Sequence, residues 1–213
     1  MSNPPPPKQR LRVTFGKRGA LIYTGHLDIA RTWERVLRRA GLPLAYSHGF
    51  NPRPRIQLAD ALPLGVSSAC ELIDIWLKEP ADVKTLAGRL GAVAPEGLPV
   101  YGAVEVDLHA PALQTIIAAA DYVLAFPDGV DAAELEARVA GFLARAHVER
   151  VRRGRAYDLR PLVHSLSVTP EGNLRATLSL GEAGTARPDE LLEALGLAGA
   201  LALIHRERLH LRP

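Results

Sequence analysis

The chain has few of the residues that build disulfides, metal sites and aromatic cores. Of its 213 residues only Cys70 is a cysteine, and aromatic residues make up 5%. A single thiol cannot close an intramolecular disulfide, and it cannot supply the several thiolates of a zinc or iron–sulfur site. We expect Cys70, which lies in an alternating apolar segment, to be a buried structural thiol. The core should be aliphatic.

Long apolar runs and standard catalytic motifs are also absent. No run approaches the ~18 consecutive apolar residues of a membrane span, and the N-terminus Met-Ser-Asn-Pro-Pro-Pro-Pro-Lys has no apolar signal-peptide core. The sequence therefore predicts a cytoplasmic protein with no membrane contact. Gly-x-Gly-x-x-Gly, a phosphate-loop lysine, Gly-x-Ser-x-Gly and histidine pairs at i, i+4 spacing do not occur. We expect no metal site, no nucleotide hydrolysis and no serine acyl transfer.

Acidic residues are scarce in the first quarter of the chain. Residues 1–55 hold eleven Lys/Arg against two acids, a balance of +9, whereas residues 56–147 hold five against thirteen, a balance of −8. Residues 148–213 are close to neutral, at +2, so the net charge of +3 conceals a strong asymmetry. Because a merely solvated surface mixes its signs, this pattern indicates a polyanionic partner or an acidic protein face.

The basic segment ends in a loop of unusual composition, Tyr46-Ser-His-Gly-Phe-Asn-Pro-Arg-Pro-Arg55. The residue before each proline favours an extended backbone, so Arg53 should project from a stiff strip. Guanidinium groups pair with phosphates and stack on bases, and aromatic rings offer further stacking faces. The alternative is that Phe50 fills the core and the arginines are simply solvated. We predict a polyanion-binding surface made of Arg31, Arg35, Arg38, Arg39, Tyr46, His48, Phe50, Asn51, Arg53 and Arg55.

Hydrophobic periodicity predicts the same element order twice. The first series is a strand at 10–15, a helix at 27–40, strands at 55–61 and 71–78, a helix at 82–90 and a strand at 100–108. The second is a strand at 122–126, a helix at 131–146, strands at 159–169 and 173–180, a helix at 188–195 and a strand at 203–211. Matching elements are about 106 residues apart. We predict an α+β protein of tandem duplicated βαββαβ ferredoxin-like units, with a single larger α+β domain as the alternative.

The prediction of two tandem units divides the chain into four segments. They are a flexible proline-rich tail at 1–9, a first ferredoxin-like unit with the basic loop at 10–108, a linker at 109–120 and a second unit at 121–213. The second unit carries an arginine-rich loop in the place of the first. Its alternative interpretation is a solvated hairpin, because Glu149 and Asp158 partly neutralise it. The predicted second anion patch consists of Arg150, Arg152, Arg153, Arg155 and Arg160.

His26 and Asp28 are the candidate catalytic residues. They lie where the chain enters the first predicted helix, and a histidine oriented by a carboxylate can act as a general acid or base. The alternative is that Asp28 caps the helix and His26 packs locally.

Several short signatures follow one another in the first third of the chain. They are Phe15-Gly-Lys-Arg-Gly, Tyr23-Thr-Gly-His-Leu-Asp28, Trp33-Glu-Arg-Val-Leu-Arg-Arg-Ala40, Leu42-Pro-Leu-Ala-Tyr-Ser-His-Gly-Phe-Asn-Pro-Arg-Pro-Arg55 and Ala61-Leu-Pro-Leu-Gly65. With these motifs the chain resembles the radical SAM-linked protein family, a bacterial domain of unknown function fused to, or encoded beside, radical SAM proteins. The family usually shows serine at the second position of Thr24-Gly25. The resemblance implies a radical SAM protein as partner, and that the iron–sulfur cluster and S-adenosylmethionine belong to that partner. It implies no intrinsic cofactor.

Three functions remain open. The leading hypothesis is a non-enzymatic accessory module that binds RNA or another polyanion for a radical SAM partner; family members are often encoded near ribosomal-protein and ribonuclease genes. The second is a metal-free RNA-cleaving or RNA-modifying enzyme that uses His26 and Asp28. The third is a docking module for an acidic surface of the partner protein.

Overall fold

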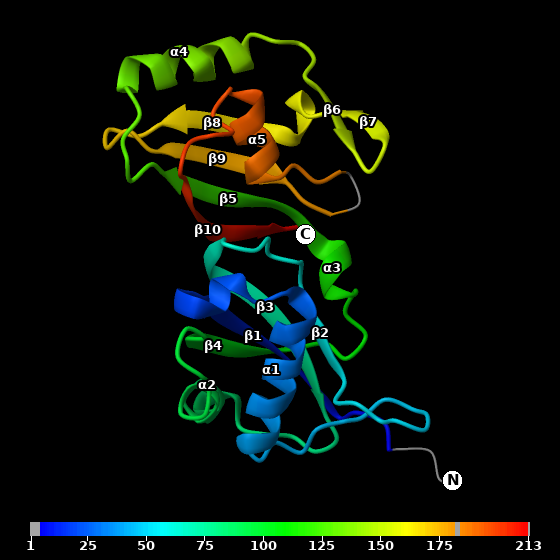
Figure 1. Ribbon diagram of the computed structural model, residues 1–213. Coiled ribbons are helices and arrows are strands. Elements are labelled where there is room, and N and C mark those ends of the chain that lie inside the picture. The colour runs from blue at the N-terminus through cyan, green and yellow to red at the C-terminus, as the bar shows by residue number, and fades with distance from the viewer. Residues whose placement is uncertain (1–4, 182–183, 213) are drawn as a thin grey trace. The chain divides into compact units, whose positions relative to one another are not determined.

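The chain divides into two units, Met1–Ile116 and Ile117–Pro213. The computed structural model describes residues 5–181 and 184–212, and its elements are labelled in Figure 1. Residues 1–4 of the predicted tail lie outside the described residues. The first strand begins within the remainder of that tail, because Lys8 N–H donates to the Leu77 carbonyl at 2.8 Å and Gln9 starts the strand.

The first unit is built around an antiparallel sheet in which β1 pairs with both β3 and β4, and β2 pairs with β3. Two longer helices, α1 and α2, join these strands. The element bounds are β1 Gln9–Lys17, η1 Gly19–Tyr23, α1 His26–Arg39, β2 Ile56–Leu58, β3 Ser67–Leu77, α2 Val83–Gly91, β4 Val100–Val106 and α3 Leu113–Ile116.

Strand β1 separates an apolar core from a polar face. Leu11, Val13 and Phe15 belong to the buried cluster that also holds residues of α1, β3 and α2. Successive side chains of a strand point to opposite faces, so Arg10 and Arg12 lie on the other side of the sheet. The core is mostly aliphatic, as the composition predicts, with an edge-on contact between Phe15 and Trp33 at 5.0 Å.

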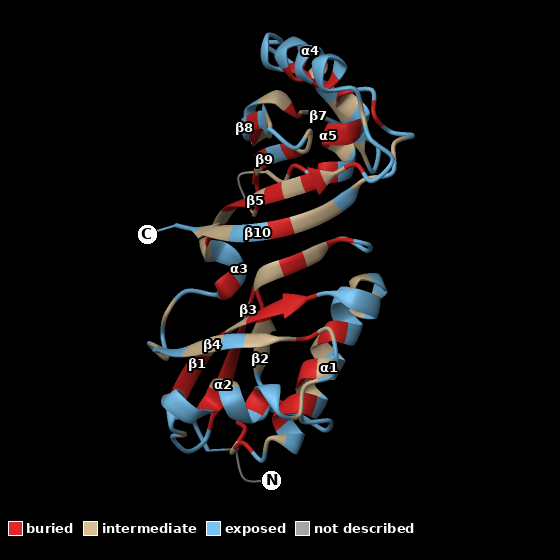
Figure 2. Cartoon of the chain, turned by 90° about the vertical axis from the view of Figure 1, so that its left-hand side faces the viewer, coloured by how far each residue is buried: buried red, intermediate tan, exposed pale blue. Residues whose placement is uncertain are grey.

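Helix α1 buries the stripe that its sequence predicts. Trp33, Val36 and Leu37 are buried, and exposed residues alternate with buried ones along the helix in Figure 2. The helix ends where Gly41 adopts a φ of +65°, a left-handed conformation that glycine adopts without steric cost.

The second unit has the same pairing scheme. Strand β5 pairs with β9 and β10, β8 pairs with β9, and every pairing is antiparallel. A separate hairpin is formed by β6 and β7. The element bounds are β5 Ile117–Ala125, α4 Ala132–Leu143, β6 Glu149–Arg152, β7 Arg155–Asp158, η2 Arg160–Leu162, β8 Val163–Val168, β9 Leu174–Ser179, α5 Pro188–Ala194 and β10 Leu203–Leu211.

Two segments differ from their predicted form. The linker expected at 109–120 contains α3 and the start of β5. The loop expected around residues 151–160 contains a tight hairpin, because Arg153 and Gly154 have φ values of 51° and 77°. Positive φ at both central residues is the geometry of a two-residue hairpin turn. Arginine is an unusual residue for that turn, so the sequence gives little sign of it.

Candidate polyanion-binding surface and adjoining cavity

The basic loop is a short hairpin, here called the arm (residues 46–55). At its base Arg55 N–H donates to the Ala45 carbonyl at 2.8 Å, and Trp76 N–H donates to the Arg55 carbonyl at 3.1 Å. Further out, Ser47 N–H donates to the Arg53 carbonyl at 2.9 Å. These bonds fix the base of the arm to β3, and the arm extends from the strands at the lower right of Figure 1.

The tip of the arm places an aromatic ring in solvent. Gly49 adopts a φ of +118°, which lets the chain reverse direction, and the next residue, Phe50, is 91% exposed. His48, Asn51 and Arg53 are exposed as well. The alternative that Phe50 fills the core is therefore wrong. The arm presents an apolar ring and cationic side chains together.

The outward face of α1 carries four exposed arginines: Arg31, Arg35, Arg38 and Arg39. Two of them pair within the helix, Arg31 with Asp28 and Arg38 with Glu34, each at 3.2 Å. The Arg31–Asp28 pair is exposed on both sides, and exposed pairs contribute only about 0–1 kcal/mol, so another anion can replace Asp28. In the second pair Arg38 is exposed, while Glu34 is largely covered. The face therefore presents four guanidinium groups to solvent.

Two cations of the basic segment, Arg10 and Arg12, make internal ion pairs. The Arg10 guanidinium pairs with the Asp74 carboxylate at 2.6 Å, and Arg12 pairs with the same carboxylate at 2.8 Å. Asp74 is fully buried, and Arg10 is 2% exposed. The +9 balance of residues 1–55 thus overstates the charge available to a ligand. The sequence places Asp74 on a strand but gives no sign of its two partners.

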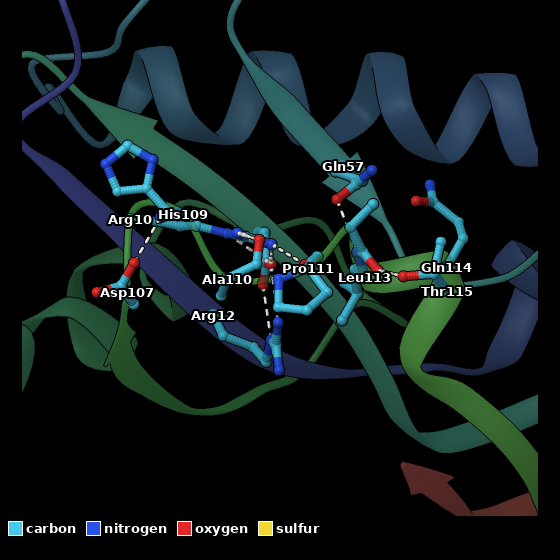
Figure 3. A network of polar contacts seen from close by, with 12 residues as sticks. Arg10, Arg12, Gln57, Asp107, His109, Ala110, Pro111, Leu113, Gln114 and Thr115 are labelled. Atoms are coloured by element: carbon cyan, nitrogen blue, oxygen red, sulfur yellow. Dashed lines mark hydrogen bonds and ion pairs between the residues drawn. The ribbon is translucent and has the colours of Figure 1, made fainter. Parts of the chain in front are cut away.

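Residues 108–114, here called the strap, cross the polar face of the sheet. Arg10 donates to the carbonyls of Ala110 and Pro111 at 2.6 and 2.9 Å. The Gln57 side-chain oxygen accepts from Leu113 N–H at 2.9 Å (Figure 3). The Gln114 amide donates to the Leu58 carbonyl at 2.7 Å. Much of the predicted linker is therefore tied to β1 and β2.

A cavity of about 540 Å³ lies between the first turn of α1, β2, Trp76 and the strap. Arg55 stacks on the Trp76 ring at 4.8 Å and Arg10 at 4.7 Å. None of the described lining residues is acidic. They are Arg10, His26, Leu27, Ala30, Arg55, Ile56, Gln57, Leu58, Trp76, Leu108, Ala110, Ala112 and Gln114.

The structure separates the two candidate catalytic residues. Asp28 pairs with Arg31, while His26 lines the cavity. Residues two positions apart point about 200° away from each other around an α-helix, so Asp28 is not placed to orient His26. The residue that caps the helix is Gly25, so Asp28 is not the cap either.

The second predicted anion patch is largely engaged in internal contacts. Arg150 pairs with Glu193 and Arg152 with Glu190. The Arg160 guanidinium donates to the Val163 and Leu143 carbonyls at 3.3 and 3.4 Å. This leaves Arg153 and Arg155 exposed at the hairpin turn.

Glu190 holds this hairpin against α5. Burial alone raises the pKa of its carboxyl, but hydrogen bonds from Arg152 and Tyr157 and the positive charge of Arg152 outweigh burial and lower that pKa. Arg152 also donates to the Thr185 carbonyl at 2.8 Å and stacks on Tyr157 at 4.9 Å. The contacts identify Arg152 as a structural residue, contrary to its predicted role in anion binding.

The described residues also bear on a metal site and a membrane span. Residues 5–181 and 184–212 contain no group of three or more His, Cys, Asp or Glu side chains placed to hold a metal ion. Within the same ranges, no helix is long and apolar enough to cross a membrane. Cys70 is half-buried in β3, with its sulfur 3.5 Å from the Ser68 hydroxyl, so it is less buried than predicted.

Residues 10–188 match the family model described as "Uncharacterized protein conserved in bacteria (DUF2344)". The chain belongs to this family. The match supports the predicted bacterial family of unknown function, while the association of this DUF2344 protein with radical SAM proteins stays a prediction. No curated protein sequence matches the chain.

Two solved structures resemble this DUF2344 protein. One is the crystal structure of a Cbf5-Nop10-Gar1 complex, with 12% identity, a TM-score of 0.51 and coverage of 93% of this chain and 48% of that chain. The other is the archaeal box H/ACA sRNP Nop10-Cbf5 complex, with 13% identity, a TM-score of 0.48 and coverage of 94% and 48%. The DUF2344 chain thus spans about half the length of the chains it matches. At 12% identity the first likeness shows the fold alone.

Proposed function

We propose that the first unit binds RNA through the arm and the outward face of α1. The observation that carries this proposal is the tip of the arm, where Phe50 is 91% exposed and Arg53, three residues later, is exposed as well. Proteins that bind single-stranded RNA combine aromatic rings, on which bases stack, with cations that follow the phosphates. The arm supplies the aromatic ring, and α1 adds cations.

The arm favours RNA over an acidic protein surface. An acidic protein surface would be recognised by complementary charge, which α1 offers. Charge complementarity alone does not explain an exposed aromatic ring at the tip of the arm. An RNA-cleaving function using His26 and Asp28 has less support, because Asp28 pairs with Arg31.

The proposal extends to an accessory role in a radical SAM system. In this role the DUF2344 protein holds the RNA, and the partner supplies the iron–sulfur cluster and S-adenosylmethionine. Support for this part comes from the resemblance of the motifs between residues 15 and 65. The single cysteine agrees with it, because the three thiolates that bind a radical SAM cluster would have to come from outside these 213 residues.

We further propose that the two units arose by tandem duplication of a ferredoxin-like βαββαβ unit. Both units pair their first strand with their third and fourth strands of the βαββαβ series, and their second strand with the third. The β6–β7 hairpin is an addition between the first helix and the second strand of the second unit.

The salt dependence of RNA binding tests the main proposal. We expect the full chain to bind a single-stranded RNA oligonucleotide at low salt, with an affinity that falls steeply as salt rises. For single strands the slope of log K against log [salt] is about −0.7 per neutralised phosphate. Fluorescence anisotropy at several salt concentrations measures this slope. Binding that ignores salt, or no binding at low salt, would contradict the proposal.

A further inference from the structure

The cavity beside the arm is large enough and positive enough for an anionic small molecule. Its volume of about 540 Å³ lies within the range of about 300–1,000 Å³ typical of ligand sites. Arg10 and Arg12 share the single carboxylate of Asp74, so this buried group keeps one positive charge. Arg55 adds another at the cavity wall, and none of the described lining residues carries a compensating carboxylate.

The first turn of α1 adds oriented donors to the same cavity. His26 and Leu27 line it, and the preceding residue, Gly25, provides no side-chain cap for the 14-residue helix. The amides of Asp28 and Ile29 donate to the Gly25 carbonyl, whereas the first two amides of a helix have no partner within it. Uncapped amides and the helix dipole together favour a phosphate at this end.

The opposite wall offers polar groups for the edge of a base. Gln57 uses its oxygen and Gln114 its nitrogen to hold the strap, which leaves a donor on Gln57 and an acceptor on Gln114. The guanidinium carbon of Arg55 lies over the Trp76 ring, 4.8 Å from its centroid. Trp76 is 6% exposed, and its indole N–H has no hydrogen-bond partner among the described residues. An acceptor on a ligand would satisfy one of these donors.

We propose that this cavity binds one nucleoside monophosphate unit. The first turn of α1, His26 and Arg55 hold the phosphate, the apolar lining packs against the base, and the amides of Gln57 and Gln114 contact the edge of the base. The unit is either a free nucleotide or the terminal nucleotide of an RNA. The second case rests on the proposed function, with the arm holding the rest of the strand.

Two arginines of the arm provide a matched test. Arg55 lines the cavity, whereas Arg53, two residues earlier, does not. We expect 5′-AMP, 5′-GMP, 5′-CMP or 5′-UMP to bind the wild-type chain in a calorimetric titration, and Arg55→Ala to weaken that binding by about tenfold or more, because a charge-assisted bond is lost. Arg53→Ala should leave nucleotide affinity within about twofold, because only the cavity contributes.

A second variant separates cavity loss from disturbance of Trp76. Ala112 is an exposed residue of the strap that lines the cavity, so Ala112→Leu reduces the space without changing any charge. It should weaken nucleotide binding and change the salt slope for a long RNA by no more than about 0.7, the value expected for the one phosphate in the cavity. Equal nucleotide affinity in wild type, Arg55→Ala and Ala112→Leu would overturn the inference. So would the absence of nucleotide binding at millimolar concentration, or inorganic phosphate binding as tightly as the nucleotide.

RNA oligonucleotides with a 5′-phosphate or a 5′-hydroxyl distinguish the two sources of the ligand. A preference for the 5′-phosphate that is lost in Arg55→Ala identifies an RNA end, and nucleotide binding without that preference identifies a free nucleotide. If RNA fails to bind while nucleotides bind, the proposed function fails and the cavity assignment stands. If RNA binds with the expected salt dependence while nucleotides do not bind, the cavity assignment fails and the proposed function stands.

Discussion

The arm of the first unit and the β6–β7 hairpin of the second occupy the same place in the order of elements, and both are rich in arginine. Their arginines have different surroundings. Arg53, in the arm, is exposed at the side of the hairpin, whereas Arg150 and Arg152 pair with carboxylates of the α5 region. A cluster of arginines therefore predicts a binding surface only where the same unit does not supply acids to pair with them.

Charge along the chain explains this difference in part. The segment that contains the arm has two acids in 55 residues, and both lie on α1. The C-terminal segment has eight acids among its last 66 residues, and Glu190 and Glu193 follow one another at helical spacing on α5. The same type of side chain is consequently available to a ligand in one unit and structural in the other.

Removing the shared carboxylate of the first unit should have the largest effect. Asp74→Ala leaves the buried Arg10 guanidinium without its partner, and breaking a buried pair costs about 3–5 kcal/mol. The free energy of unfolding from urea denaturation measures the loss. Asp74→Asn, which keeps the volume and an acceptor oxygen, is the control and should lose less. Equal stability of wild type and Asp74→Ala would show that the arginines of this face need no internal anion.

The paired arginine of the hairpin should matter more for stability than the exposed arginine of the arm. Arg152→Ala removes the charge-assisted pairing with Glu190 and should lower the free energy of unfolding by at least about 1.5–3 kcal/mol, the contribution of one such bond. Arg53→Ala is the matched control and should change it by less than about 0.5 kcal/mol. If both variants lost the same stability, the two hairpins would not differ in the way that their contacts indicate.

RNA affinity, unlike stability, should depend more on the arm than on the β6–β7 hairpin. Phe50→Ala removes an exposed stacking ring, and stacking contributes about 1–3 kcal/mol per base. Arg53→Ala should weaken binding by less and reduce the salt slope by about 0.7. Arg153→Ala, at the exposed turn of the β6–β7 hairpin, should change neither quantity. An equal loss of RNA affinity in Arg153→Ala and Arg53→Ala would extend the binding surface to the second unit.

Periodic segments were the most predictable part of the fold. The stripe of Trp33, Val36 and Leu37 repeats at helical spacing, and the structure buries all three. The sequence does not predict the strap, because its contacts, such as those of Arg10 with Ala110 and Pro111, join residues about 100 positions apart. Their main-chain acceptors are independent of residue type, so composition and spacing carry no sign of them.

The candidate site was predictable only where one segment forms it. The arm is continuous in sequence, so its exposed aromatic and cationic residues could be recognised together. The cavity draws Arg10, His26, Gln57, Trp76 and Gln114 from five separate segments. A sequence shows these residue types but not that they meet. For the same reason it did not show that Glu190 and Glu193 pair with arginines of the predicted second patch.

A smaller effect should come from the protonation of Glu190 when the pH is lowered. The pKa of Glu190 in the folded chain lies below its ordinary value of 4.5, because Arg152 and Tyr157 stabilise the carboxylate more than burial destabilises it. A lowered pKa means that this stabilisation is fully present above the unfolded pKa and is lost as pH falls through the folded pKa. Urea unfolding of wild type and Glu190→Gln should therefore differ at pH 7, and the difference should shrink as the pH falls below 4.5 and through the lowered pKa of the folded chain. Asp121 and Asp158 also have lowered pKa values, so both chains lose stability in acid, and only the difference between them reports on Glu190. A difference that persisted unchanged in acid would mean that Glu190 stabilises the hairpin by packing rather than by its charge, which would remove the electrostatic distinction between the two arginine-rich hairpins.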